Sequence, residues 1–360
     1  MARVHIVGAG PAGCIAAMSA LESGHEAIVS EEHDEAGWPA TCSGLFSQEG
    51  LRTLGGFVDY RKTVINSIRG ADIYFSQEVF RVRTKETVAY VCDRAEFDAR
   101  LAQNTEAAGA QMRYGERIKG EFKSDLIIGA DGPNSHVAAH FGFPAIRRYV
   151  CTMKALVPYD SAAGNGPSII NMHLSSDRFP GFFGWMIPHS KDMAEFGAGV
   201  ALPGNVRTAW DHLMKMHNIS GQQAVSSDII PMEARSRVSM ETGRKKVLLT
   251  GDAAGQVKTT TGGGVIFGCN CAKLAGKHAA NPTRYELGWR TRYGPDLFLH
   301  RAIRDHLDSL DEKRLASLGR RLNRMELGDY LGEHGSMDSP MKMMTPSLIL
   351  HGIRAIAGLK

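Results

Sequence analysis

The chain has 360 residues, of which 43% are hydrophobic, and a formal net charge of +4. This length and composition predict a globular protein with a large core and two or three structural units. No run of 18 uncharged apolar residues occurs, which excludes a membrane-spanning helix. Zinc-finger spacing and basic-aromatic platforms are also missing from the sequence, which argues against nucleic acid as a partner.

The cysteines and histidines have no metal-ligand spacing, so no metal is expected. The first glycine turn begins at residue 8, too near the first residue for a signal peptide to precede it. We therefore expect reduced thiols in a cytoplasmic protein. The six cysteines are Cys14, Cys42, Cys92, Cys151, Cys269 and Cys271.

The first 31 residues read as a strand, a glycine turn, a helix and a second strand that ends in a carboxylate. The turn consists of Gly8, Ala9, Gly10, Pro11, Ala12 and Gly13. Gly8 allows the tight turn, Gly10 lets a pyrophosphate approach the backbone, and Gly13 lets helix and strand pack closely. Glu31 stands where a carboxylate accepts hydrogen bonds from ribose hydroxyls. This segment predicts a dinucleotide site.

Residues 37–46 form a loop rich in turn formers around one thiol, Cys42. Because the loop follows the ribose strand, it can reach the redox ring of a bound cofactor. The alternative is a structural turn with a half-buried cysteine. The residues alone leave these two interpretations equal.

In short runs between residues 64 and 91, apolar and polar residues alternate as they do in β-strands. This pattern predicts an excursion of antiparallel strands out of the parallel sheet. Asp93 and Glu96 then resemble a capping box for a helix that ends near Gly109. Arg94 in the first turn opposes the helix dipole, so a partner is expected to hold it, either a cofactor oxygen or a surface carboxylate.

A buried-type strand at residues 125–129 returns the chain to the parallel sheet. Asp131 follows it, flanked by glycines, and is expected either to fix the turn or to support the cofactor. Residues 149–240 are again rich in strands and predict a second sheet domain. Its most distinctive segment runs from Pro180 to Pro188, where Phe183 and Trp185 share one strand face and form either ordinary core or a shaped apolar wall.

The segment after residue 246 contains a strand, the turn Gly251-Asp252, and the triple glycine Gly262, Gly263 and Gly264 at the start of a helix. Asp252 is suited to accept a ribityl hydroxyl. The bare N–H groups after Gly262 are suited to the N1/O2 edge of a flavin, whose anionic reduced form a helix start stabilises. Three glycines at a helix start have no ordinary packing explanation.

The last ninety residues, 271–360, hold 15 Lys and Arg against 10 Asp and Glu. A basic tail favours anionic lipid or diphosphate, while a solvated helical surface is the alternative. The tail ends in an apolar stretch with Met337, Met341, Met343 and Met344. It is either a docked terminal helix or a surface element that contacts lipid.

Three motifs together carry a family resemblance. The turn at Gly251–Gly264 is similar to G-D-A-A-G-x-v-x-P-x-T-G-G-G, the segment Pro180–Pro188 to P-x-x-Y-x-W-x-F-P, and residues 39–44 more loosely to K-P-x-C-G-G. With the dinucleotide turn, they resemble the FAD-binding scaffold of the para-hydroxybenzoate hydroxylase superfamily. Within it, the chain resembles the geranylgeranyl reductase family over nearly all its length. Phe183 stands where that family has tyrosine, and Thr259 where it has proline.

The resemblance implies an FAD-dependent reductase that saturates C=C bonds in geranylgeranyl or other polyprenyl chains, of archaeal membrane lipids or of geranylgeranyl diphosphate. Reduced FAD supplies hydride from N5, and an acid or water supplies a proton. Trp185 and Phe183 are expected to line an apolar tunnel with Pro180 and Pro188 and to stabilise positive charge on the tertiary carbon. Cys42 is the candidate near the alkene, as proton source or positioning group.

The implied fold is α/β, with a Rossmann-like FAD-binding domain, an inserted antiparallel β-sheet substrate domain and a C-terminal helical region. The expected domains are 1–62 with 93–148 and 245–281 for FAD, 63–92 and 149–244 for substrate, and 282–360 for the helices. The expected FAD ligands are Gly8, Gly10, Pro11, Ala12, Gly13, Glu31, Cys42, Arg94, Asp131, Gly251, Asp252, Gly262, Gly263 and Gly264.

Two other functions remain open on the sequence. A flavin monooxygenase or halogenase on the same scaffold would consume oxygen, and a flavin or lipid carrier would show no turnover. The electron donor of a reductase, ferredoxin or NAD(P)H, is also open, as is peripheral contact with a membrane.

Overall fold

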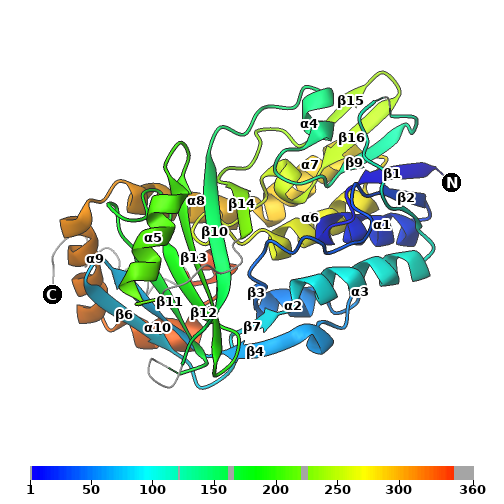
Figure 1. The fold of residues 1–360 in the computed structure, drawn as a ribbon. Helices are drawn as coiled ribbons and strands as arrows, with labels where there is room; N and C mark the ends of the chain where they lie inside the picture. The colour runs from blue at the N-terminus through cyan, green and yellow to red at the C-terminus, as the bar shows by residue number, and fades with distance from the viewer. Residues whose placement is uncertain (1, 121, 161–165, 220–225, 344–360) are drawn as a thin grey trace.

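The computed structural model describes residues 2–120, 122–160, 166–219 and 226–343, which form three β-sheets and their covering helices. Figure 1 shows the parallel sheet near the N-terminus on one side of the molecule and the large antiparallel sheet on the other. The last part of the predicted apolar tail, residues 344–360, lies outside the described residues. None of the helices in the described part has the length and apolar character needed to cross a bilayer.

The first sheet has six strands, and only its edge strand β15 is antiparallel. In spatial order they are β15 (Ser239–Thr242), β16 (Lys245–Leu249), β9 (Leu126–Gly129), β1 (Arg3–Val7), β2 (Glu26–Ser30) and β8 (Gln111–Arg113). The central strands are short runs of Val, Ile and Leu and are buried, as parallel strands are when helices cover the sheet. The predicted Rossmann-like core is confirmed.

Helix α1 (Pro11–Glu22) packs against β1, α3 (Arg94–Ala107) and α6 (Val265–Lys277). Glycines make the closest of these approaches. A Cβ on Gly13 would lie 1.9 Å from the Gly8 carbonyl oxygen, and one on Gly276 would lie 2.2 Å from the Ala16 carbonyl oxygen. Helix α1 is therefore held at a spacing that side chains at these positions would not permit.

The second sheet has seven strands: β14 (Ser226–Pro231), β10 (Tyr149–Pro158), β13 (Met193–Ala201), β12 (Gly184–Pro188), β11 (Ile169–Leu174), β5 (Gly70–Phe75) and β6 (Glu78–Arg83). Every pair is antiparallel except β11 with β5. Helix α5 (Val206–Met216) covers one face through Trp210 and Leu213, and its N-cap is Asn205. The predicted antiparallel sheet is confirmed.

The predicted excursion at residues 64–91 divides between two sheets. Strands β5 and β6 join the large sheet, whereas β4 (Val64–Ile68) and β7 (Ala89–Cys92) pair with β3 (Leu45–Ser47) in a third sheet of three strands. Helix α2 (Gln48–Leu54) follows β3, and its N-cap is Ser47. Because β3 directly follows the Cys42 loop, this small sheet anchors that loop.

The C-terminal part is helical, as expected. Its helices are α7 (Pro282–Arg292), α8 (Gly294–Asp308), α9 (Glu312–Arg324), α10 (Leu327–His334) and α11 (Pro340–Met343). Helices α9 and α10 cover β5 and β6, with leucines facing the sheet. Three further helical elements of the described part are short: α4 (His136–His140) follows β9, and 3-10 turns span Tyr60–Thr63 and Gly251–Ala254.

The contact between α1 and α6 predicts a stability difference between two helical glycines. Gly276→Ala should lower the free energy of unfolding by about 2–4 kcal/mol, because the new methyl would overlap the backbone of α1. Gly288→Ala on α7 is the matched control, since its Cβ meets nothing closer than 3.6 Å. It should be neutral or stabilising by up to about 1 kcal/mol. Urea denaturation of both variants measures the difference; equal stabilities would contradict the close approach.

Candidate active site

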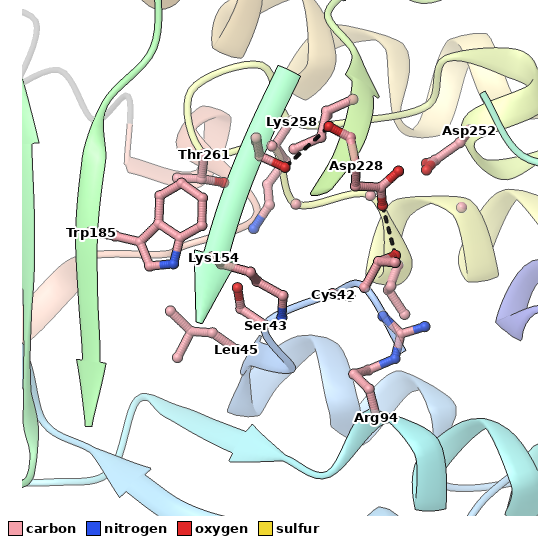
Figure 2. A pocket seen from close by; sticks show the side chains of 18 of the residues that line it. Cys42, Ser43, Leu45, Arg94, Lys154, Trp185, Asp228, Asp252, Lys258 and Thr261 are labelled. Atoms are coloured by element: carbon pink, nitrogen blue, oxygen red, sulfur yellow. Dashed lines mark hydrogen bonds between the residues drawn. The ribbon is translucent and has the colours of Figure 1, made fainter. Parts of the chain in front are cut away.

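A cavity of about 370 Å³ lies between the parallel sheet and the large antiparallel sheet. It brings together segments that are far apart in the sequence: the first glycine turn, the Cys42 loop, the aromatic segment before and in β12, and the loop at Gly262–Gly264. Figure 2 shows Cys42, Trp185 and Asp252, which come from three different segments, around one common space. The convergence that the sequence analysis required is therefore present in the structure.

In the first glycine turn, one glycine has space for a side chain and two do not. A Cβ on Gly10 would meet nothing within 4 Å, whereas Gly8, with φ +99°, and Gly13 lie against backbone atoms. Gly10, Pro11 and Ala12 line the cavity. Helix α1 has no side-chain cap in the described structure, so its first N–H groups are free to bind an anion. This arrangement suits a pyrophosphate in front of Gly10.

Glu31 lies behind the same turn. Its carboxylate accepts a hydrogen bond from the Ala9 N–H at 2.7 Å and from the His33 N–H at 3.0 Å. It does not line the cavity. The structure places this acid beside the glycine turn, directly after β2, and His33 Nδ1 makes a third contact with it, 2.7 Å from Glu31 Oε1.

The second glycine region follows β16. A 3-10 turn (Gly251–Ala254) carries Asp252 into the cavity, and Gly262, Gly263 and Gly264 line it immediately before α6. Gly262 has φ +71°, a conformation that favours glycine. The loop is closed by a hydrogen bond from the Lys258 N–H to the Gly263 carbonyl at 3.1 Å. Helix α6 also has no side-chain cap within the described residues.

Asp252 has no hydrogen-bond or ion-pair partner in the described part of the chain. Burial raises the pKa of Asp252 to about 6, and the nearby carboxylate of Asp228 adds to the effect. Asp252 is partly buried and faces the cavity without a partner, so it is suited to accept a hydrogen bond from a hydroxyl group of a ligand.

Cys42 and Arg94 meet at another wall of the cavity. Cys42 is half-buried, and Arg94 begins α3 and makes a two-pronged ion pair with Asp98, at 3.1 Å and 2.7 Å. Burial by itself would lower the pKa of Arg94, but the paired carboxylate of Asp98 outweighs it and raises the pKa. Arg94 is thus a buried, fixed cation that also contacts the thiol, not a surface salt bridge. Thr41 hydrogen-bonds Asp228 of β14 at 2.7 Å and ties this loop to the large sheet (Figure 2).

Phe182, Phe183 and Trp185 form the aromatic wall. Phe182 and Phe183 stack with ring centroids 4.1 Å apart, and Trp185 meets Phe183 edge-on at 5.8 Å. Two glycines of β13 make room for them: a Cβ on Gly197 would lie 2.1 Å from the Trp185 ring, and one on Gly199 would lie 2.4 Å from Phe182. The flat wall therefore depends on small residues in the neighbouring strand.

A buried ion pair interrupts this apolar wall. Lys154 of β10 lines the cavity, and its Nζ lies 2.6 Å from Glu195 Oε2 on β13. The other oxygen, Glu195 Oε1, accepts a hydrogen bond from Trp185 Nε1 at 3.0 Å. Glu195 is therefore satisfied on both oxygens, and it fixes the orientation of the indole ring.

A second buried ion pair closes the side formed by the C-terminal segment. Lys258 Nζ lies 2.5 Å from Asp338 Oδ1 and 3.3 Å from the Met337 carbonyl oxygen. Ser47 hydrogen-bonds the other oxygen of Asp338. Met337 itself lines the cavity. Segment 336–338 is thereby fastened to the glycine loop that precedes α6.

Some predicted site residues lie elsewhere. Asp131 accepts hydrogen bonds from Ser135 Oγ at 2.6 Å and from the Val137 N–H at 2.9 Å, so it holds the turn into α4 and does not line the cavity. Pro180 is exposed, and Pro188 is buried outside the cavity at the end of β12. These two prolines bound the aromatic segment and do not contribute to its wall.

Lys154, Asp228, Lys258 and Glu195 were missed by the sequence analysis. The available signal was in β13, where an acid precedes alternating glycines in an otherwise apolar strand, Glu195-Phe196-Gly197-Ala198-Gly199. Period-two alternation puts residues 195, 197 and 199 on one face. Lys154 of β10 and Lys258 of the loop before α6 could not be recognised as site residues from the sequence, because Glu195 and Asp338, with which they pair, are distant in the sequence.

These residues fit FAD. The open face of Gly10 and the uncapped starts of α1 and α6 suit its pyrophosphate and its flavin edge, and the unpartnered Asp252 carboxylate suits its ribityl chain. The redox ring would then face the aromatic wall and Cys42. FAD would supply two-electron chemistry at this place.

The open space at Gly10 predicts a variant that folds but does not bind FAD. Gly10→Val should keep the fold, since the backbone angles at this position (φ −65°, ψ 175°) are open to any residue and a Cβ meets no atom. It should weaken FAD binding by roughly 100-fold or more, because the side chain occupies the space of the pyrophosphate. Fluorescence titration of apo-protein with FAD measures this, and Gly56→Ala, also in open space, is the control. Unchanged affinity would contradict the placement of the pyrophosphate.

The raised pKa of Asp252 predicts a pH-dependent stability difference in the FAD-free protein. The folded-state pKa of about 6 lies above the ordinary value of 3.8, so ionisation destabilises the fold as pH rises through this window. Asp252→Asn should match the wild type near pH 3.5 and exceed its free energy of unfolding by up to roughly 3 kcal/mol at pH 7. Denaturation at both pH values tests this, with Asp211→Asn on the surface as control. A difference that does not grow with pH would contradict it.

Two relatives match this chain over most of its sequence. The chain is 24% identical to digeranylgeranylglycerophospholipid reductase of Methanosarcina acetivorans, over 88% of this chain and 87% of that protein. It is 26% identical to digeranylgeranylglycerophospholipid reductase 1 of Methanopyrus kandleri, over 87% and 92%. Among solved structures, it is similar to a geranylgeranyl bacteriochlorophyll reductase-like protein of Thermoplasma acidophilum, with TM-score 0.78, 20% identity and coverage of 98% and 96%.

The fold is also similar to the flavin-dependent brominase Bmp2, with TM-score 0.70, 15% identity and 99% coverage of both chains. At these identities the structures establish the fold, which is that of FAD-dependent flavoproteins. The family model described as FAD binding domain matches residues 69–278, more than half of the sequence. The chain belongs to this FAD binding domain family of FAD-dependent oxidoreductases, and FAD is its cofactor.

Proposed function

We propose that this oxidoreductase saturates C=C bonds in the geranylgeranyl or other polyprenyl chains of isoprenoid lipids. The observation that carries the proposal is that a single cavity joins the FAD-binding glycine loops to an aromatic and aliphatic wall. The apolar lining residues are Leu45, Ile170, Met172, Phe182, Phe183, Trp185, Ile187, Ile230, Val265 and Met337. Such a wall suits a hydrocarbon chain in contact with a redox ring. The names of the relatives from Methanosarcina acetivorans and Methanopyrus kandleri support the same class of substrate.

The charges of the cavity support a neutral chain inside it. Each lining cation is paired with a carboxylate: Arg94 with Asp98, Lys154 with Glu195, and Lys258 with Asp338. Asp228 and Asp252 also line the cavity and form no ion pair within the described residues. An anionic head group would therefore find no free cation among these residues, so we place the phosphate or diphosphate outside the cavity.

The reaction adds a hydride and a proton to the two carbons of the alkene. Reduced FAD supplies the hydride. The protein residues bind and orient the chain, exclude water, and stabilise positive charge at the branched carbon. Trp185 and Phe183 present ring faces and edges to the chain, and cation–π attraction of this kind contributes about 0.5–2 kcal/mol per ring. Cys42, held beside Arg94, positions the alkene or supplies the proton.

The experiment is a single turnover without oxygen. FAD-loaded protein is reduced with dithionite, which replaces the natural donor, whether ferredoxin or NAD(P)H, and is mixed with digeranylgeranylglycerophospholipid or geranylgeranyl diphosphate. We expect the oxidised flavin spectrum to return and the lipid to gain two hydrogens per double bond. Substrate-triggered oxygen consumption with a hydroxylated or halogenated product would instead indicate a monooxygenase or halogenase. Unchanged flavin reoxidation would indicate a carrier.

Trp185 gives the matching variant test. Trp185→Ala should keep FAD and lower the rate of alkene reduction by roughly 10-fold or more, because the wall and its π face are removed. Trp185→Phe restores an aromatic face but not the hydrogen bond to Glu195, so it should recover part of the rate. Full turnover in Trp185→Ala would remove Trp185 from the substrate wall.

A further inference from the structure

We propose that Lys258 binds the N1/O2 edge of the FAD ring and stabilises its anionic reduced form, and that Asp338 of the C-terminal segment tunes this effect as the counter-ion. The inference concerns the cofactor and goes beyond the proposed function, because it holds for any substrate of the reduced ring. Lys258 is one of the side chains around the cavity in Figure 2.

The side chain of Lys258 lies against the glycines that precede α6. A Cβ on Gly263 would lie 2.9 Å from Lys258 Cε and 3.4 Å from Lys258 Nζ. Gly263 and Gly264 lead into α6, whose first N–H groups have no side-chain cap within the described residues. The ammonium is therefore next to the backbone donors that suit the flavin edge, and it adds a positive charge to them.

The ammonium of Lys258 has one donor left for a ligand. Of its three N–H groups, one is taken by Asp338 Oδ1 at 2.5 Å and one by the Met337 carbonyl oxygen at 3.3 Å. The described part of the chain offers no acceptor to the third. Lys258 is only 6% exposed and lines the cavity. Because N1 and O2 of a flavin are acceptors, the third N–H can form a charge-assisted hydrogen bond with this edge.

The other ionisable groups around Lys258 leave it as the positive charge at this helix start. A Cβ on Gly264 would lie 2.6 Å from Asp252 Oδ1, so the carboxylate suited to the ribityl chain is beside the next glycine. The Nδ1 atom of His300 lies 2.7 Å from Thr260 Oγ1. Burial lowers the pKa of His300 to about 4, and the charge of Lys258 adds to the effect. His300 is therefore neutral at pH 7 and adds no second positive charge.

A cation at this edge distinguishes the two redox states of the ring. Reduction by two electrons takes up two protons when N1 becomes protonated, and one proton when N1 stays anionic. The oxidised ring is neutral, whereas the reduced ring with anionic N1 carries a negative charge. Lys258 therefore interacts more strongly with the reduced state, which raises the reduction potential of bound FAD and favours the one-proton form.

Asp338 limits the effect of Lys258. It is 7% exposed, and Ser47 donates a hydrogen bond to its second oxygen. Burial alone would raise the pKa of Asp338, but the charge of Lys258 outweighs burial and lowers the pKa, so Asp338 is ionised. A cation without this counter-ion would hold the electrons of the ring more firmly and weaken hydride donation. The docking of segment 336–338 thus sets the strength of the reductant.

The first test compares the affinities of the protein for oxidised and reduced FAD. The double variant Lys258→Met with Asp338→Asn removes both charges, so neither is left buried alone. Beyond any loss for oxidised FAD, its affinity for reduced FAD should fall roughly 10-fold or more, as expected for a lost hydrogen bond between charged groups. For a two-electron couple this lowers the reduction potential by about 30 mV. Anaerobic titration against a redox dye measures the potential.

The outcomes separate a redox role from a structural one. A pair that only fastens the C-terminal segment would change both FAD affinities equally, so a wild-type potential in the double variant would overturn the role of Lys258. Asp338→Asn alone leaves the ammonium uncompensated and should shift the potential upward. A potential that stays unchanged or falls in this variant would overturn the role of Asp338. Lys277→Met, at the exposed last turn of α6, is the control and should keep the wild-type potential.

The pH dependence of the potential provides a second readout. The pH at which reduction changes from uptake of two protons to uptake of one should be higher in the double variant than in the wild type, because the cation that favours anionic N1 is gone. An unmoved transition would contradict contact of Lys258 with this edge. Neither measurement needs a substrate. Failure of the wild type to reduce an alkene would therefore refute the proposed function and leave this inference standing.

Discussion

Helix α1 lies against β1 and α6 at a spacing that only glycine permits. Gly13 faces the Gly8 carbonyl and Gly276 faces the Ala16 carbonyl, each so closely that a methyl group would overlap backbone atoms. This packing directs the uncapped N–H groups of α1 toward the cavity. It also brings α6, with the Gly262–Gly264 loop at its start, to the same place. The position of the cofactor site follows from backbone contact, before any side chain binds a ligand.

On the opposite wall of the cavity, glycines also permit close packing, but there they make room for aromatic side chains. In β13, Gly197 and Gly199 leave room for Trp185 and Phe182 to lie across the strand. Glu195, two residues earlier on that face, then hydrogen-bonds the indole. A single strand thus provides the space for the aromatic wall and the polar anchor that orients it. The α/β half carries the glycine loops of the cavity, and the antiparallel half carries its aromatic wall.

Buried charges are the most costly feature of this cavity. Desolvation of an ion pair often offsets its attraction, so three such pairs around one cavity are weak evidence for stability. Their positions are informative in another way. Arg94 lies beside the Cys42 loop, Lys258 fastens the C-terminal segment through Asp338, and Lys154 joins β10 to β13 through Glu195. Lys154 with Glu195 and Lys258 with Asp338 join segments that are distant in the sequence, whereas Arg94 and Asp98 lie one turn apart in α3.

Local patterns in the sequence were sufficient to predict the glycine turns, the strands around them and the aromatic segment. Spacing within one turn or one strand fixes what Gly10, Asp252 or Trp185 can do, because the relevant geometry spans only a few residues. Asp131 shows the limit: its glycine-flanked position suggested either a cofactor or a turn, and only the contacts with Ser135 and Val137 place it on the turn.

The tertiary structure alone decided the partners of Lys154 and Lys258. Lys154 and Glu195 are 41 residues apart, and Lys258 and Asp338 are 80 apart, so no local periodicity relates them. Sheet register brings the first pair together, and the docking of the C-terminal segment brings the second. The sequence determined the elements and the cofactor chemistry that they carry. The arrangement of the two sheets determined which side chains face the cavity.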